Sequence, residues 1–135
     1  MNLRFQRVTF RDEALEDLRG LAVRSRVLVL EVFRQLKALD AGELQPTPLR
    51  SFAKSGDLRD CGKLVVAVAG EGELRIVVRD VAGGGFVVSE VIVIEDRADD
   101  LPYLLAGLRL GRLHDPVRRS EAQRRIDRIR RLREG

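Results

Sequence analysis

The chain has 135 residues, of which 44% are hydrophobic, enough for one domain with a modest core and too many for a disordered polypeptide. A single cysteine and a single histidine exclude an internal disulfide and a zinc site of several Cys and His ligands, although carboxylates alone could hold a hard cation. The N-terminal residues lack the apolar run of a secretion signal, and no stretch approaches the ~18 apolar residues of a membrane helix. We therefore expect a cytoplasmic protein that contacts no membrane and needs no cofactor.

The net charge of +4 resides in the C-terminal part of the chain. Residues 114–135 contain eight arginines and four acidic residues, whereas residues 1–113 contain 17 basic and 17 acidic residues. We interpret 1–113 as the domain and 114–135 as an arginine-rich helical extension. A basic appendage on a neutral body indicates a polyanion or an acidic protein as partner, unless it serves solubility alone.

The first part of the chain predicts a strand followed by a helical hairpin. Residues 3–10 alternate between apolar and polar side chains, as a strand does. We expect Asp12 to cap a first helix, and Ser25 to begin a second one. Gly42 is typical of a helix stop, and the prolines that follow it confirm a break in the pattern.

Three apolar runs then predict a β-meander. They are KLVVAVA, ELRIVVRDV and FVVSEVIVI, and they follow a polar loop. The separators GEG and AGGG are typical of hairpin turns. Strands joined by such short turns pair antiparallel.

Two helices are predicted after the meander. Asp99 or Asp100 caps the first, with Pro102 tolerated in its first turn. The second lies in the extension, where apolar residues recur at helical spacing and opposite charges stand four residues apart. The apolar residues are Ala122, Ile126 and Ile129, and the charge pairs are Glu121–Arg125 and Asp127–Arg131.

The resulting order, β-α-α-β-β-β-α plus the helix of the extension, predicts an α+β fold. We expect a small antiparallel β-sheet with a helical hairpin packed on one face and an extra C-terminal helix. The helices should all stack on one face of the sheet and leave the other face open.

Basic residues on the meander are the main candidates for chemistry. Lys63 opens its first strand, Arg75 lies in the second, and Arg97 ends the third, so their side chains can converge on the open face. The register stays undetermined, because a slip of one residue in the GEG hairpin would turn Lys63 and Arg75 to opposite faces. Tyr103, one turn into the next helix, can reach the same concavity. The alternative is that these are solvated surface cations and a packing tyrosine.

This residue set suits work on a phosphate. Lysine and arginine bind phosphate and stabilise the extra negative charge of a transition state. If the substrate is RNA, its own 2′-hydroxyl serves as nucleophile, and the protein need supply only acid–base help and charge. Tyrosine can stack on a displaced base. Arg79 shares a face with Arg75, because the two stand four residues apart on one strand.

The stretches DCGK, LRIVVR and VIVIEDRADDLPYLLAGLRL, in this order of elements, resemble the RelE/ParE superfamily of bacterial toxins. The resemblance is greatest to the RelE branch of ribosome-dependent messenger-RNA endonucleases, covers roughly residues 3–113 and is best over 58–110. In that branch an Asp-Cys-x-Lys stretch opens a strand, an arginine follows in the next strand, and a terminal strand arginine precedes a tyrosine by six residues. The matching residues here are Lys63, Arg75, Arg97 and Tyr103.

The resemblance implies a catalytic role for each matched residue. Lys63 would be a general base or charge stabiliser, and Arg75 would contact the phosphate in the transition state. Arg97 would bind phosphate or assist the leaving group, and Tyr103 would orient the base. It also implies a cognate antitoxin as partner, together with messenger RNA and the ribosome. Further RNA contacts are expected from Arg79, Arg118, Arg119, Arg124, Arg125 and Arg128.

The sequence also departs from the family pattern. Val65 stands where the family has a second lysine, and Leu74 and Val78 replace the tyrosines beside the strand arginine. The arginine-rich extension has no counterpart in the compact toxins. It either binds ribosomal RNA or packs on the core as a plain helix. Two other functions therefore stay open, a ParE-like inhibitor of DNA gyrase and a catalytically degenerate binding module.

Overall fold

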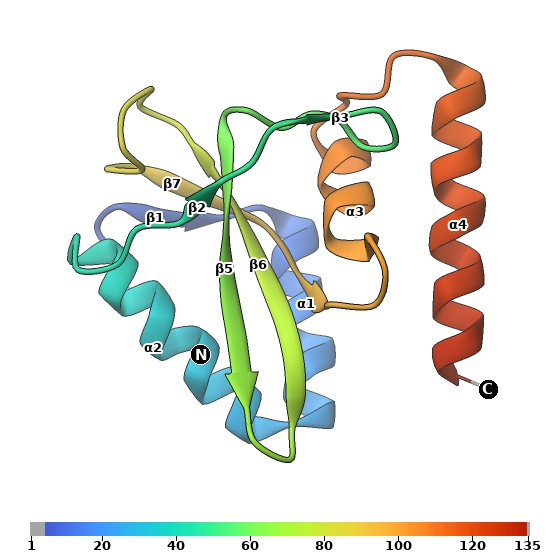
Figure 1. Ribbon diagram of the computed structural model, residues 1–135. Coiled ribbons are helices and arrows are strands. Elements are labelled where there is room, and N and C mark those ends of the chain that lie inside the picture. Colours follow the sequence, from blue (N-terminus) through green and yellow to red (C-terminus); the bar gives the residue numbers. More distant parts are fainter. Residues whose placement is uncertain (1–4, 135) are drawn as a thin grey trace.

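A computed structural model of the chain describes residues 5–134 (Figure 1). The part of the predicted N-terminal strand before Phe5 lies outside the described residues. The elements are β1 (Val8–Phe10), α1 (Asp12–Arg24), α2 (Arg26–Asp40), β2 (Thr47–Pro48), β3 (Ser51–Phe52), β4 (Gly56–Asp57), β5 (Cys61–Val68), β6 (Gly72–Asp80), β7 (Ser89–Asp96), α3 (Leu101–Arg109) and α4 (Pro116–Glu134).

The predicted α+β fold is confirmed, with one refinement in the sheet. β5, β6 and β7 form the expected antiparallel meander, and the main sheet has the order β1-β7-β6-β5-β2. The first strand, β1, pairs parallel with β7, so the sheet is mixed. The loop before the meander also contains three two-residue strands, of which β3 and β4 form a separate hairpin.

Ser25 separates the two helices of the N-terminal hairpin. The second helix begins after Ser25 as predicted, and Ser25 Oγ caps α2 by accepting a hydrogen bond from the N–H of Leu28 at 3.1 Å. The prediction for Asp12 was wrong: it is the first residue of α1, and Arg11 stands at the N-cap position without a side-chain hydrogen bond. Asp12 still lies in the first turn, where its charge stabilises the helix dipole.

The helices cover both faces of the sheet, so the prediction that they stack on one face was wrong. Ile76 belongs to the apolar cluster of α1 and α2, whereas the next residue, Val77, belongs to that of α3 and α4. Neighbouring residues of a strand point to opposite faces, so the sheet is the middle layer of three. α1 and α2 therefore cover one face of the sheet, and α3 with α4 covers the other.

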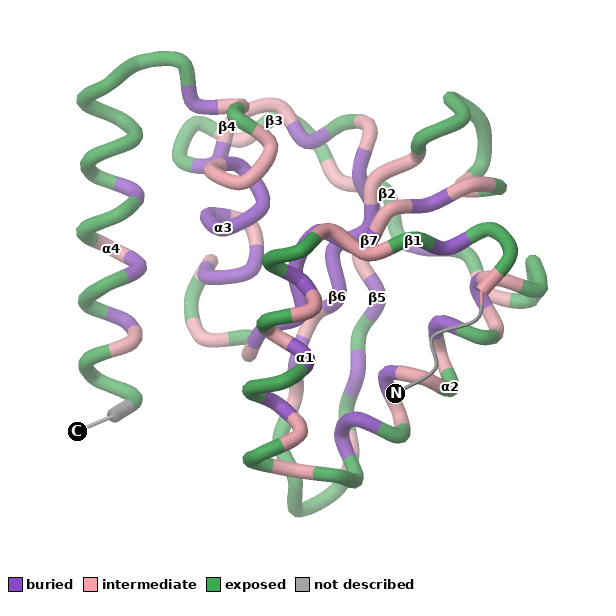
Figure 2. The backbone as a smooth tube through the Cα atoms, turned by 180° about the vertical axis from the view of Figure 1, so that it is seen from behind, coloured by how far each residue is buried: buried purple, intermediate pink, exposed green. Residues whose placement is uncertain are grey.

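α4 packs against α3 through the apolar residues expected from its sequence. Ala122, Ile126 and Ile129 are buried, and Figure 2 shows this stripe on the side of α4 that faces α3. The predicted charge pairs within the helix are absent from the described residues: Arg125 pairs with Asp100 beside α3, and Asp127 accepts from Gln123. α4 is rich in arginine, and no helix of residues 5–134 is long and apolar enough to cross a bilayer.

Candidate functional site

Arg75 and Arg97 meet at one carboxylate where β6 and β7 run side by side. The backbone N–H of Arg97 donates to the carbonyl of Glu73 at 3.2 Å, which extends the pairing of the two strands by one residue. Arg75 Nη1 donates to Glu73 Oε1 at 2.5 Å, and Arg97 Nη1 lies 4.0 Å from Glu73 Oε2. Glu73 therefore holds two of the predicted cations together.

Glu73 is a residue of this cluster that the sequence reasoning missed. The hydrogen bond from Arg75 lowers the pKa of Glu73, and the charges of Arg75 and Arg97 act in the same direction, against a smaller effect of desolvation. The side chain is thus an anion at physiological pH. The available signal was the Glu-x-Arg spacing on β6, since residues two apart in a strand share a face.

Lys63 lies on the same face of the sheet as Arg75. Lys63 is opposite Val77, and Val65 is opposite Arg75, so the two basic residues are diagonal neighbours across β5 and β6. Such neighbours have Cα atoms roughly 7–8 Å apart. The register left open by the sequence is therefore the one that brings the two residues together. Lys63 is half-buried and borders a cavity of about 510 Å³ along the edge of β5.

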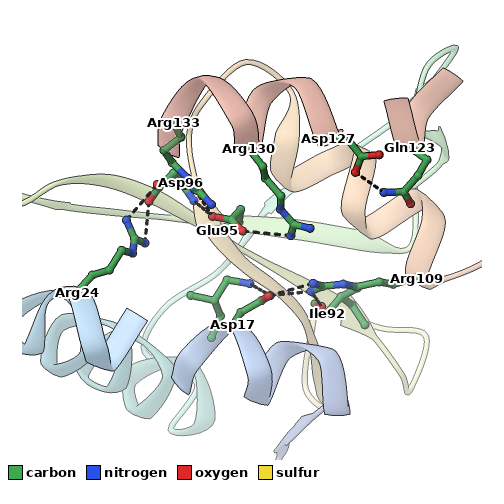
Figure 3. Close-up of polar contacts among 11 residues, drawn as sticks. Asp17, Arg24, Ile92, Glu95, Asp96, Arg109, Gln123, Asp127, Arg130 and Arg133 are labelled. Carbon is green, nitrogen blue, oxygen red and sulfur yellow. Dashed lines mark hydrogen bonds and ion pairs between the residues drawn. The ribbon is translucent and has the colours of Figure 1, made fainter. Parts of the chain in front are cut away.

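Arg75 is much less accessible than Arg97. Its side chain is 11% exposed, against 67% for Arg97. Opposite it on β7 stands the buried Glu95, which accepts from Arg133 Nη1 at 2.7 Å and lies 3.7 Å from Arg130 Nη2 (Figure 3). The C-terminal end of α4 is therefore anchored at the strand position next to Arg75.

Tyr103 packs against a second aromatic ring. It is in the first turn of α3, where its ring stacks on Phe52 with centroids 6.0 Å apart and an interplanar angle of 18°. Arg50 extends this group, since its guanidinium lies 6.0 Å from the centre of the Phe52 ring. No hydrogen bond or ion pair of the described residues joins Tyr103 to the basic residues of the sheet.

The Asp60–Lys63 stretch fixes the start of β5. Arg112 donates to both carboxylate oxygens of Asp60, at 2.8 and 2.7 Å, and these bonds lower the pKa of Asp60 against the effect of partial burial. Burial, followed by the charge of Asp60, raises the pKa of the Cys61 thiol to about 12. Cys61 is therefore a neutral thiol inside the core and has no nucleophilic role.

The arginines expected to contact RNA fall into two groups. Arg79 is held by Glu90, with Nε 3.1 Å from Oε1, and Arg119 donates to two backbone carbonyls before α4. These two side chains bind groups of the protein itself. The others border a cavity of about 450 Å³ between α4 and the β3–β4 hairpin: Arg118, Arg124, Arg125 and Arg128, together with Lys54.

No protein-family model matches the sequence, and no curated protein matches it either. The structure, however, is similar to that of a mutant of the E. coli toxin RelE in the free state. The two superpose with a TM-score of 0.53 and 17% sequence identity, over 82% of this chain and 99% of the RelE chain. At this identity the likeness concerns the fold alone. The chain therefore has a RelE-like fold, as its sequence motifs indicated.

Proposed function

We propose that the protein is the toxin of a type II toxin–antitoxin system and cleaves messenger RNA in the ribosomal A site without a metal ion. The observation that carries this proposal is the gathering of Arg75 and Arg97 at Glu73, with Lys63 on the same face of a RelE-like sheet. A group of fixed cations without a protein nucleophile suits a substrate that attacks itself.

In the proposed reaction the 2′-hydroxyl of one nucleotide attacks the phosphorus on its 3′ side. The new bond joins the 2′ oxygen to phosphorus, and the bond to the 5′ oxygen of the next nucleotide breaks. Lys63 is the candidate base for the hydroxyl proton, and the 5′ oxygen takes a proton from water. Arg75 and Arg97 stabilise the charge on the phosphate oxygens. The products are a 2′,3′-cyclic phosphate and a 5′-hydroxyl.

Glu73 has to give way before a phosphate can reach Arg75. The carboxylate already occupies one N–H of the guanidinium, and it also lies near Arg97. A phosphate carries oxygens of the same geometry and can replace the carboxylate in both contacts. Tyr103 is proposed to stack on a base, for which it would have to leave Phe52 or offer the free edge of its half-buried ring.

The test is cleavage of messenger RNA on programmed ribosomes in the presence of a chelator, with 5′ ends mapped to the codon in the A site. Lys63→Ala, Arg75→Ala and Arg97→Ala should each lower the cleavage rate by about 10²–10³. Tyr103→Ala should lower it too, whereas the surface variant Arg19→Ala should not. Variants of Lys63 and Arg75 that cleave at the wild-type rate, or cleavage that needs a metal ion, would sink the proposal.

A second candidate function is that of a non-catalytic binding module, either a ParE-like gyrase inhibitor or a degenerate toxin. It is favoured by the ion pair that neutralises Arg75, by the low exposure of this residue, and by Val65 in place of a second lysine. Induction in cells separates the candidates. An early halt of translation favours the nuclease, and an early DNA-damage response favours the gyrase inhibitor. In either case a cognate antitoxin is expected to cover the basic face.

A further inference from the structure

α4 carries arginines of two kinds on different sides. Arg130 and Arg133 are paired with Glu95, and these contacts attach the helix to the sheet. By contrast, no ion pair or side-chain hydrogen bond within residues 5–134 involves the exposed side chains of Arg118, Arg124 or Arg128. These three side chains therefore contribute nothing evident to the docking of α4.

The unpaired arginines lie along one groove. Together with Arg125, and with Lys54 from the opposite wall, they border the cavity of about 450 Å³ between α4 and the β3–β4 hairpin. Ten residues of helix separate Arg118 from Arg128, so the basic row is about 15 Å long. Its lining includes a single acidic residue, Glu121.

Arg125 is only loosely held by the protein. Its Nη2 lies 3.9 Å from Asp100 Oδ2, and its Nε is buried without a hydrogen-bond partner among the described residues. A buried N–H donor without a partner destabilises a protein by about 1–3 kcal/mol. A ligand that offers an acceptor to the guanidinium of Arg125 would remove this cost.

The aromatic pair Phe52–Tyr103 precedes residues of the groove lining in the chain. Ala53 and Lys54 follow Phe52 in the chain, Leu104 follows Tyr103, and all three contribute to the lining. Both rings are half-buried, so each has an edge or face toward solvent. Basic grooves with aromatic rings nearby are typical of proteins that bind single-stranded nucleic acid, whereas an acidic peptide would need the cations alone.

We propose that the groove of Lys54, Arg118, Arg124, Arg125 and Arg128 binds the sugar–phosphate backbone of single-stranded RNA. This site is separate from Lys63, Arg75 and Arg97, and the inference goes beyond the proposed cleavage. Its role is to hold a strand of RNA by its phosphates. α4 then serves the domain both as a packing helix and as an RNA-binding arm.

The probe is a short fluorescein-labelled oligouridylate with 2′-O-methyl sugars. It lacks the attacking hydroxyl, so binding is measured by fluorescence anisotropy whether or not the protein is a nuclease. The groove variant is Arg118→Ala/Arg124→Ala/Arg128→Ala. Its matched control is Arg7→Ala/Arg26→Ala/Arg131→Ala, which removes three exposed arginines outside the groove, one of them on α4.

The groove variant should bind the probe at least about tenfold more weakly, and its slope of log affinity against log salt should fall by about 2, since each phosphate contact on a single strand adds about 0.7. The matched control should stay close to the wild type. Glu121→Gln, which removes the acid of the lining, should tighten binding roughly two- to fivefold.

Equal losses in the groove variant and the matched control would overturn the proposal, because they would mean attraction by net charge alone. In a competition experiment, oligoglutamate and unlabelled RNA are each used to displace the labelled probe from the wild-type protein. An oligoglutamate that binds as tightly as RNA of equal charge would assign the groove to an acidic protein instead. Cleavage is tested at Lys63 and Arg75, and binding is tested at the groove with a probe that cannot be cleaved, so failure of one proposal does not imply failure of the other.

Discussion

Asp17 of α1 and Arg109 of α3 join the two outer layers across the free edge of β7. Arg109 donates to both oxygens of Asp17, at 2.6 and 2.9 Å, and both side chains are nearly buried (Figure 3). Asp17 also accepts from the N–H of Ile94, and Arg109 donates to the carbonyl of Ile92. The pair satisfies backbone groups of β7 beyond the end of β1, and so protects an edge that would otherwise be open to another strand.

Replacing Asp17 by alanine should lower the free energy of unfolding by about 3–5 kcal/mol, because it leaves Arg109 as an unpaired buried charge. The measurement is urea unfolding followed by circular dichroism. The neighbouring Glu16→Ala serves as control: Glu16 pairs with Arg19 at the surface, so its loss should cost at most about 1 kcal/mol. Similar small effects of the two substitutions would show that the edge pair is not a main support of the fold.

Glu95→Gln should loosen the C-terminal end of α4. The substitution removes the carboxylate that pairs with Arg130 and Arg133, and leaves Arg133 bonded to Asp96. A hydrogen bond to a charged group contributes about 1.5–3 kcal/mol. We expect faster hydrogen exchange in α4 and faster tryptic cleavage at its arginines, with the rest of the domain unchanged. Asp127→Asn is the control, since Asp127 accepts a hydrogen bond from Gln123 of its own helix. Equal protection of α4 in both variants would contradict the anchoring role of Glu95.

Gly107→Ala should strongly destabilise the protein. Gly107 lies in α3 against the backbone of Ser55, and an added Cβ would overlap the carbonyl oxygen of Ser55. The β3–β4 hairpin would have to move, at a cost of about 1–3 kcal/mol or more. In Gly20→Ala, on the exposed side of α1, the new Cβ meets no atom within 4 Å. That variant should gain up to about 1 kcal/mol, so opposite shifts of Tm are expected, and equal shifts would refute the close contact.

The Asp60–Arg112 pair should make stability depend on pH in the acid range. Arg112 lowers the pKa of Asp60 in the folded protein, whereas the unfolded chain titrates near about 4. The carboxylate therefore stabilises the fold above that pH, and the contribution is lost as the pH falls through the lower folded value. Asp60→Asn should cost most at neutral pH and progressively less toward strong acid. A cost that stays constant with pH would contradict this linkage.

The sequence predicted those parts of the fold that local patterns determine. The meander follows from three apolar runs with glycine-rich separators, and the α1–α2 junction follows from the Ser25 cap. The predicted order of layers was wrong, because the face of the sheet that each helix covers depends on tertiary contacts and not on local patterns. The run Val91–Ile94 carried the missing signal: four consecutive apolar residues on one strand indicate that both faces are covered, and all four are buried.

Charge pairing was the least predictable part of the candidate site. Arg125 was expected to pair within α4, yet it lies near Asp100, because a tertiary partner replaced the local one. Glu73 was overlooked since its role depends on Arg97, a residue brought opposite it only by the pairing of β6 with β7. Two-residue strands such as β3 have no sequence signal of their own, and the place of Tyr103 against Phe52 depends on that short hairpin.

The pairing of β1 with β7 has a consequence for synthesis. Val8 pairs with Ser89, so β1 has no strand to pair with until β7 has been synthesised. Until then α1 lacks β7, the strand against which it packs, and such delayed, non-local closure is slow. A ribosome that makes this protein has translated most of the chain before Arg75 and Arg97 can come together.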